Sequence, residues 1–273
     1  MSRKRITQLF PFLLPIRIWQ RNLFYTIGMF FDKNKYANES GDLLKYEISN
    51  TKTLMVNENS GYDLVYQKNK VDNLKIASKT MNHILIYPGE VFSFCYLVRK
   101  YRKYGKYKKG LLSIDGKVVA KTGGGLCHLS NLLHLLFLMS PLTVIERHGH
   151  KEKSFPDPDK NAIQGIDATI HSGWLDLRVK NETNFIYQID ISFDDLYMYG
   201  RILSNKESLV EYSLLNENLR YIKENGKIYE CVSIVRVEMD LNTKKIVRKQ
   251  KLYDEKVLLH YDLPEDVEVE ELC

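Results

Sequence analysis

The sequence predicts an α+β fold with N-terminal helices, a central helix packed on antiparallel strands, and a β-rich C-terminal part. An apolar run from Leu126 to Met139, stopped by Pro141, is long enough for a helix. Apolar residues recur at helical spacing before residue 83, and alternation with polar residues dominates after residue 174. We expect three regions: a helical region (1–66), an α+β core (67–203) and a β-rich subdomain (204–273).

Composition indicates an ordinary folded protein. The 273 residues are 44% apolar and 27% charged, which suits one large domain or two joined ones. A net charge of +6 from 40 basic and 34 acidic residues describes a mixed surface, so we expect no nucleic-acid partner. Four cysteines without a CxxC pair predict neither a disulfide framework nor a zinc site, and fit a reducing compartment.

The N-terminal apolar stretch is not typical of a targeting or spanning segment. Leu9 to Trp19 is broken by Pro11, Pro15 and Arg17, and no run approaches the roughly 20 apolar residues of a membrane span. We therefore expect a cytoplasmic protein without a transmembrane segment. Peripheral contact with the inner face of the membrane stays open.

Two helices are expected before the core. Apolar residues at positions 16, 19, 23, 27 and 30 form one face of an amphipathic helix over Ile16 to Phe30. Because few basic residues line its polar side, we expect this face to pack on the protein's own core rather than on a membrane. A second helix is predicted around Asn69 to Asn82.

Short strands and turns follow. Ile84 to Tyr87 and Val91 to Cys95 are expected as strands, and Leu111 to Ile114 should form a hairpin with Lys117 to Ala120 about Asp115-Gly116. Between them, Arg99 to Gly110 interleaves seven basic residues with three tyrosines. That composition is compatible with binding an anionic polymer, but a solvated mobile loop is the preferred interpretation.

Three consecutive glycines, Gly123 to Gly125, end directly against the central helix and place Cys127 in its first turn. Unpaired backbone N–H groups and the positive end of the helix dipole stabilise a thiolate there. Cys127 is therefore a candidate nucleophile. The alternative is that the glycines make a tight turn and Cys127 is a small buried apolar residue.

Histidines and an aspartate follow the cysteine. Leu142 to His150 is expected as a strand that projects Glu146, His148 and His150 from one face, and Gly165 to Ile170 as a strand that carries Asp167. Cysteine, histidine and aspartate in this order match papain-like and transglutaminase-like thiol enzymes, whose core combines a helix with an antiparallel sheet.

In such a site a thiolate attacks a carbonyl, an imidazole shuttles the proton and a carboxylate fixes the imidazole. We assign these roles to Cys127, His150 and Asp167, with His148 and Asp176 as substitutes. The backbone N–H groups of Cys127 and His128 would form the oxyanion hole. Substrate contacts are expected from the surrounding residues Gly123, Gly124, Gly125, His128, Ser130, Glu146 and Arg147.

A metal site is the competing interpretation. Cys127 and His134 lie seven residues apart and share a helix face that His148 and His150 could approach. Tight ligand spacing is absent, and His134 can be satisfied locally, so we rank zinc below thiol chemistry and expect no metal or cofactor.

The remaining chain is predicted to be β-rich and without catalytic candidates. Leu175 to Val179 and Phe185 to Phe193 alternate as half-buried antiparallel strands joined through Asn181-Glu182-Thr183. Asn225-Gly226 predicts a hairpin. Val232 to Val237 and Lys245 to Leu252 are expected in an edge-exposed sheet.

Several motifs together resemble the VanW family in order and approximate spacing, and the resemblance extends to both ends of the chain. They are Pro88-Gly89-Glu90-Val91-Phe92-Ser93-Phe94, Gly123-Gly124-Gly125-Leu126-Cys127 with Leu129-Ser130, Glu146-Arg147-His148-Gly149-His150, Asp167-Ala168-Thr169, Asp176-Leu177-Arg178 and Asn181-Glu182-Thr183.

The resemblance implies a bacterial protein associated with glycopeptide resistance of the vancomycin B type or with the cell envelope, but it supplies no reaction. The family commonly has glutamine where this chain has His128, His134 lies outside the family motif, and the position of His148 varies, which ranks His150 first as the base. Two hypotheses follow. One is a thiol enzyme, an amidase, peptidase or transpeptidase of peptidoglycan precursors; the other is a non-catalytic accessory protein that binds a cell-wall peptide or a partner enzyme.

Overall fold

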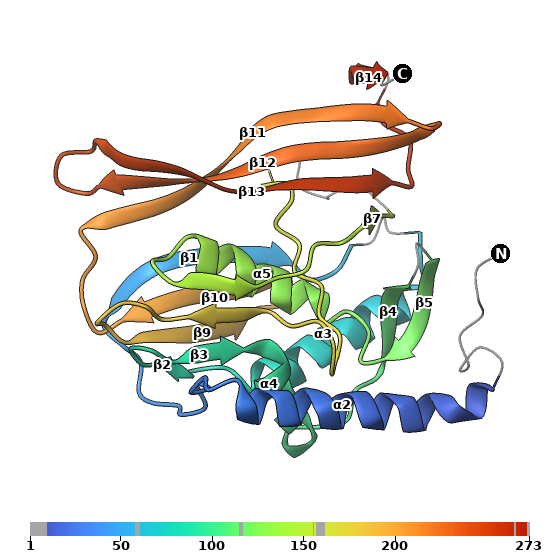
Figure 1. Ribbon diagram of the computed structural model, residues 1–273, viewed down its shortest axis with the longest axis horizontal. Helices are drawn as coiled ribbons and strands as arrows, with labels where there is room; N and C mark the ends of the chain where they lie inside the picture. The colour runs from blue at the N-terminus through green and yellow to red at the C-terminus, as the bar shows by residue number, and fades with distance from the viewer. Residues whose placement is uncertain are drawn as a thin grey trace.

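The computed structural model describes residues 10–57, 61–114, 117–154, 156, 162–264 and 266–271. It confirms an α+β fold with a β-rich C-terminal part (Figure 1). The helices are η1 (Pro11–Leu13), α2 (Leu14–Phe31), α3 (Leu64–Ser78), α4 (Phe94–Val98), η3 (Arg99–Lys103) and α5 (Cys127–Leu138). The strands are β1 (Tyr46–Leu54), β2 (Leu85–Ile86), β3 (Val91–Ser93), β4 (Lys109–Ile114), β5 (Lys117–Thr122), β6 (Thr143–Glu146), β7 (Glu152–Lys153), β8 (Arg178–Lys180), β9 (Tyr187–Phe193), β10 (Tyr197–Ser204), β11 (Val210–Glu224), β12 (Lys227–Asp240), β13 (Ile246–Leu259) and β14 (Val269–Glu271).

The strands form two larger and two smaller sheets. One larger sheet has the order β1-β10-β9-β2, and the other, at the C-terminal end, has the order β14-β11-β12-β13-β7. The smaller sheets are β3-β8-β6 and the hairpin β4-β5. Leu175–Val179 and Phe185–Phe193 were expected to pair, but β8 and β9 belong to different sheets, because Asn181 turns the chain by bonding Ile86 and Phe185 carbonyls.

The apolar run forms the predicted helix, α5, and this helix packs against both larger sheets. A side chain at Gly200 of β10 would lie 2.6 Å from Leu136, so glycine allows the helix to approach that strand closely. On its other side, Leu138 packs with Val232 and Ile234 of β12. The site at the start of α5 is therefore fixed by contacts at both faces of the helix.

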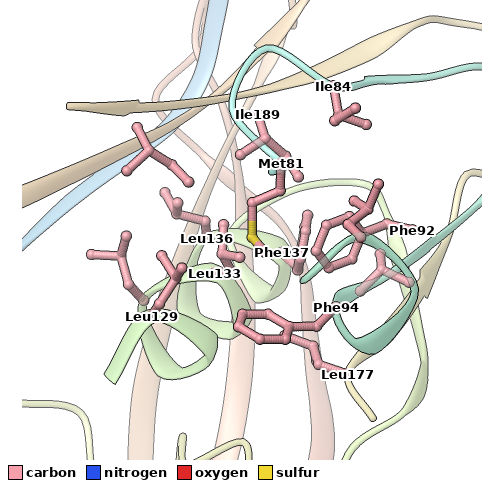
Figure 2. Packing of buried hydrophobic residues seen from close by; sticks show 14 of the residues in the cluster. Met81, Ile84, Phe92, Phe94, Leu129, Leu133, Leu136, Phe137, Leu177 and Ile189 are labelled. Carbon is pink, nitrogen blue, oxygen red and sulfur yellow. The ribbon is translucent and has the colours of Figure 1, made fainter. Parts of the chain in front are cut away.

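The main core surrounds α5 (Figure 2). Phe92 of β3 and Phe137 of α5 pack with ring centroids 5.1 Å apart, and Phe94, Met81 and Leu177 complete this region without exposed surface. Such large apolar side chains each contribute about 1.5–3 kcal/mol when removed from water.

The C-terminal sheet confirms the predicted hairpin at Asn225-Gly226. Glu224 pairs with Lys227 across a two-residue turn whose residues have φ of 50° and 73°, the left-handed values that this turn needs. Val232 to Val237 were expected in an edge-exposed sheet. This prediction is wrong for β12, because β12 lies between β11 and β13 and its Ile234 is fully buried.

Of two strands predicted near the site, one is shorter than expected and the other is absent from the described residues. The strand expected over 142–150 ends at Glu146, and residues 165–170 are irregular. The Arg147 guanidinium bonds the carbonyls of Gly165 and Asp167, and Thr169 N–H bonds His148 O at 2.7 Å. These contacts hold the irregular segment after β6 beside the irregular segment 165–170.

The basic segment 99–110 is partly ordered. It contains the 3₁₀ helix η3, and Tyr101 stacks on Tyr107 with centroids 4.0 Å apart. The hairpin that follows is confirmed by the pairing of β4 with β5, while its predicted turn, Asp115-Gly116, lies outside the described residues.

Helix α2 confirms the predicted N-terminal helix but not its packing. Of its residues only Met29 is buried, and the apolar face expected in the core is exposed, with Phe30 83% and Trp19 65% accessible. Polar side chains of the opposite face contact the protein body instead. Within the described residues, no helix has both the length and the apolar character needed to cross a membrane.

Candidate thiol site

The glycine loop before α5 brings the backbone into a conformation that other residues rarely adopt. Gly123 and Gly125 have φ of 79° and 94°. A side chain at Gly124 would lie 2.2 Å from the Gly110 carbonyl oxygen, so this glycine is required by the close approach of β4. The loop then enters α5 with the half-buried Cys127 as its first residue.

Cys127, His150 and Asp167 come together at this point. The Nδ1 atom of His150 lies 3.2 Å from Asp167 Oδ1, and the Cys127 side chain is close enough to the same imidazole to contribute to raising its pKa. Because Nδ1 faces the carboxylate, Nε2 is left for the sulfur. The side chains of His150 and Asp167 are 28% and 34% exposed, so a substrate can reach them from solvent.

The electrostatics of the cluster favour a protonated imidazole. Burial lowers the pKa of His150, but its hydrogen bonds to the side chains of Asp167 and Cys127, with the charges of these groups, outweigh the effect of burial and raise this pKa to about 10. Burial would raise the pKa of Asp167, but the hydrogen bond and charge of His150 hold it below its ordinary value. The cluster therefore places a protonated imidazole beside the sulfur, the pairing found in thiol nucleophiles.

Two further side chains fix the aspartate. Asn131, one turn along α5 from Cys127, donates from Nδ2 to Asp167 Oδ1 at 2.8 Å and accepts from Ala168 N–H at 2.8 Å. Arg147 donates to the Asp167 carbonyl oxygen at 2.5 Å. Arg147 was expected to contact substrate, but its contacts are with the chain that carries Asp167.

The C-terminal sheet supports the site from behind, which the sequence did not indicate. Glu255 of β13 forms an ion pair with Arg147, and a side chain at Gly149 would lie 2.3 Å from Glu255 Oε1. The Tyr253 hydroxyl donates to the Gly165 carbonyl at 3.1 Å, and its ring lies 4.7 Å from the Arg147 guanidinium. Only the alternation of β13 hinted at inward-facing polar residues here.

The substitutes for the base and the carboxylate lie elsewhere. His148 pairs with Glu146 at 3.1 Å, and Glu146 also contacts Arg178 at 3.2 Å, so neither turns toward Cys127. Asp176 is fully buried and accepts from Ser93 Oγ at 2.5 Å and Cys95 N–H at 2.8 Å. Asp176 therefore organises the fold around β3 and α4 and cannot orient His150.

Ser130 and His128, which were expected to contact substrate, form hydrogen bonds within the protein. Ser130 is buried and donates to the Ala168 carbonyl at 2.5 Å. The His128 ring bonds Thr53 Oγ1 through Nε2 at 2.8 Å. Burial, with the nearby charge of Lys70, lowers the pKa of His128 to about 3, so this ring is neutral at physiological pH.

One of the two N–H groups expected to form an oxyanion hole is bonded elsewhere. The His128 N–H is committed to the Gly125 carbonyl at 3.1 Å and is not free for an oxyanion. By contrast, the N–H groups of Leu126 and Cys127 have no acceptor among the residues that the structure describes, and no side chain caps the helix. These two donors are the ones available to a developing negative charge.

Lys70 of α3 is a neighbour that the sequence did not indicate. Its side chain crosses the glycine loop so closely that a Cβ on Gly125 would lie 2.3 Å from Lys70 Cγ. It forms no ion pair within the described part of the chain, and burial lowers its pKa to about 8. It thus places an unpaired cation next to the start of α5.

His134 does not join Cys127 in a metal site. It is fully buried, its Nδ1 atom bonds the Ile166 carbonyl at 2.6 Å, and burial lowers its pKa to about 4. Among the described residues no three histidine, cysteine or acidic side chains are placed to hold a metal ion. A cavity of about 610 Å³ lies beyond His134 and Arg147, and Cys127, His150 and Asp167 do not line it.

Comparisons with known proteins agree with the motifs. The model of the "VanW like protein" family matches residues 69–203. "Vancomycin B-type resistance protein VanW" of Enterococcus faecalis is 44% identical over 272 residues, which cover 99% of each chain. "Uncharacterized protein YoaR" of Bacillus subtilis is 27% identical over 117 residues, 43% of this chain and 37% of that protein. No solved structure matches, so the likeness to papain-like cores remains a prediction. On the full-length identity and the family match, this chain belongs to the VanW family.

Proposed function

We propose that this protein is a bacterial accessory protein of vancomycin resistance in which Cys127, His150 and Asp167 form a thiol site acting on an amide or peptide of cell-wall precursors. The observation that carries the chemistry is the chain of contacts from the sulfur through the imidazole to the carboxylate. The resistance role rests on the printed name of the 44% identical relative.

The geometry supports a two-step acyl transfer. The Cys127 thiolate attacks the carbonyl carbon, a C–S bond forms, and the carbonyl electron pair moves to oxygen beside the N–H groups of Leu126 and Cys127. As the C–N bond breaks, the His150 imidazolium gives its proton to the leaving amine. His150 then takes a proton from water, the water oxygen bonds to the thioester carbon, and the C–S bond breaks. This releases the acid and restores the thiolate beside the imidazolium, while Asp167 keeps the ring oriented.

The position of Lys70 supports the proposal that the substrate is negatively charged. A buried ammonium group without a carboxylate partner binds an anion favourably, because the partner replaces the water that the lysine has lost. Its position over Gly125 places such an anion next to the thiol. A peptide with a carboxylate close to the bond under attack fits this arrangement, and Lys70→Met should weaken its binding without unfolding the protein.

A cytoplasmic location is part of the proposal. The described cysteines Cys95, Cys127 and Cys231 are free thiols, which is the usual state in a reducing compartment. Cell-wall precursors are accessible there before export.

The test uses Cys127→Ala and His150→Ala in a vancomycin resistance assay, with Cys231→Ser as a matched thiol control and circular dichroism as a folding check. We expect both site variants to lose resistance and the control to retain it. Iodoacetamide labelling followed by mass spectrometry should modify Cys127 faster than Cys231 below neutral pH. Full resistance in both folded site variants would leave the non-catalytic binding role instead.

A further inference from the structure

Helix α2 is attached to the protein through its polar side. Tyr25 donates to Asp176 at 2.6 Å, Asn22 accepts from Ser172 at 3.0 Å, and Arg21 contacts His171 at 3.1 Å. Thr26 accepts from Arg99 at 2.8 Å. Spacings of four relate Arg21 to Tyr25 and Asn22 to Thr26, and a spacing of three relates Asn22 to Tyr25, so these contacts come from one side of the helix.

The opposite side is apolar and uncovered. Ile16, Trp19, Leu23, Phe24, Ile27 and Phe30 follow the same helical periodicity on that side, and their exposed fractions range from 39% for Leu23 to 83% for Phe30. Figure 1 shows α2 running along an outer edge of the molecule, away from the C-terminal sheet. A row of large apolar side chains over a whole helix marks an interaction surface.

Basic residues lie along and beside this helix. Residues 10–31 contain Arg17 and Arg21 and no acidic residue. Arg99, which bonds Thr26, begins the exposed basic run of η3, with Lys100, Arg102 and Lys103. Basic residues next to an apolar helix face complement an anionic surface, and they repel a second copy of the same face.

We propose that α2 docks this protein on an anionic lipid surface, lying in the interface with its apolar side among the acyl chains. The 18-residue helix α2 does not combine the length and the apolar character needed to cross a bilayer. Exposed Trp19 and Phe30 suit the boundary between headgroups and acyl chains, where aromatic side chains are favoured. Electrostatic attraction from η3 adds to the apolar contribution.

The test is sedimentation of the full-length protein with vesicles of phosphatidylcholine alone or mixed equally with phosphatidylglycerol. We expect binding to the mixed vesicles that weakens as salt rises, and at least about tenfold weaker partitioning for Phe24→Glu and for Phe30→Glu. The matched control is Ile246→Glu, at a 64% exposed apolar residue of β13, and it should bind as the unmodified chain does. In a Trp174→Phe background, which leaves Trp19 as the single tryptophan, fluorescence should shift to the blue on binding.

Three results would overturn the proposal. The first is that the unmodified protein binds neither kind of vesicle, and the second is that both Phe variants bind the mixed vesicles as strongly as the unmodified protein does. The third is a dimer in solution that Phe24→Glu dissociates, which would assign the face to a second copy. Cys127 labelling in the Phe variants should be unchanged. The membrane proposal can therefore fail while the thiol site stands.

Discussion

Replacing Asp167 with asparagine removes the charge that holds His150 protonated while keeping the shape of the site. The asparagine oxygen can still accept from Asn131 and His150, so geometry is preserved and charge is isolated. With Nδ1 and Oδ1 3.2 Å apart, Coulomb's law gives about 1.3 kcal/mol at the dielectric constant of water and about 5 kcal/mol at an effective value of about 20. Since both side chains are about a third exposed, solvent screening favours the lower half of this range.

The expected result is a fall of about one to two units in the pKa of His150, since one unit corresponds to about 1.4 kcal/mol. The assay is NMR titration of the imidazole signals, assigned with His150→Gln. In the unmodified protein His150 should titrate at about 10. The matched control is Glu152→Gln, which removes another histidine–carboxylate pair, with His260, of the same 3.2 Å separation; it should leave the His150 titration unchanged.

The same substitution predicts a pH-dependent change in stability. The folded-state pKa of His150 is above its ordinary 6.5, so its contribution is complete below about 6.5 and is lost as pH rises through about 10. The folded-state pKa of Asp167 is below 3.8, so its contribution is present above 3.8 and lost as pH falls. Asp167→Asn should therefore lower the free energy of unfolding most between about pH 3.8 and 6.5, where both contributions are complete. A His150 signal titrating near 6.5, or the same pKa with and without Asp167, would refute the reasoning.

Three more substitutions test other parts of the structure. Asn131→Ala leaves Ala168 N–H without its acceptor and should lower the free energy of unfolding in urea by about 1–3 kcal/mol; an unchanged midpoint would show that this amide does not hold the Asp167 loop. Asp176→Ala removes a buried carboxylate paired with Arg178 at 3.1 Å and should cost about 3–5 kcal/mol, seen as a large loss of thermal stability; mild destabilisation with lost thiol reactivity would instead make it part of the site. Gly226→Ala meets no atom within 4 Å but forces alanine into φ 73°, so about 1 kcal/mol should be lost in the same urea assay, through backbone strain alone.

Local sequence patterns were sufficient for the elements whose structure depends on near neighbours. The apolar run after three glycines forms α5, and Asn225-Gly226 forms its hairpin, because helix periodicity and left-handed turn residues act within a few positions. The presence of a cysteine at the first helical residue followed that same logic. The ranking of His150 above His148 had a different basis, the resemblance to the VanW family.

Tertiary contacts decided what periodicity could not. Alternation predicted a strand through His150, but Arg147 bonds to the 165–167 segment end the strand at Glu146, and the loops so formed bring His150 to Asp167. From the sequence, Asp176 was a possible substitute for the carboxylate that orients the histidine. In the structure it is buried and bonded to Ser93, Cys95 and Arg178, so it stabilises the fold.

Taken alone, the sequence determined that a cysteine begins a helix after a glycine loop and that an amphipathic helix precedes the core. Only the tertiary structure decided which histidine and aspartate reach that cysteine, that Lys70 and Glu255 flank the site, and that the apolar side of α2 faces outward. The physical reason is range. Helix and turn preferences arise within a few residues, whereas these placements depend on hydrogen bonds and ion pairs between segments as far apart as 153 positions.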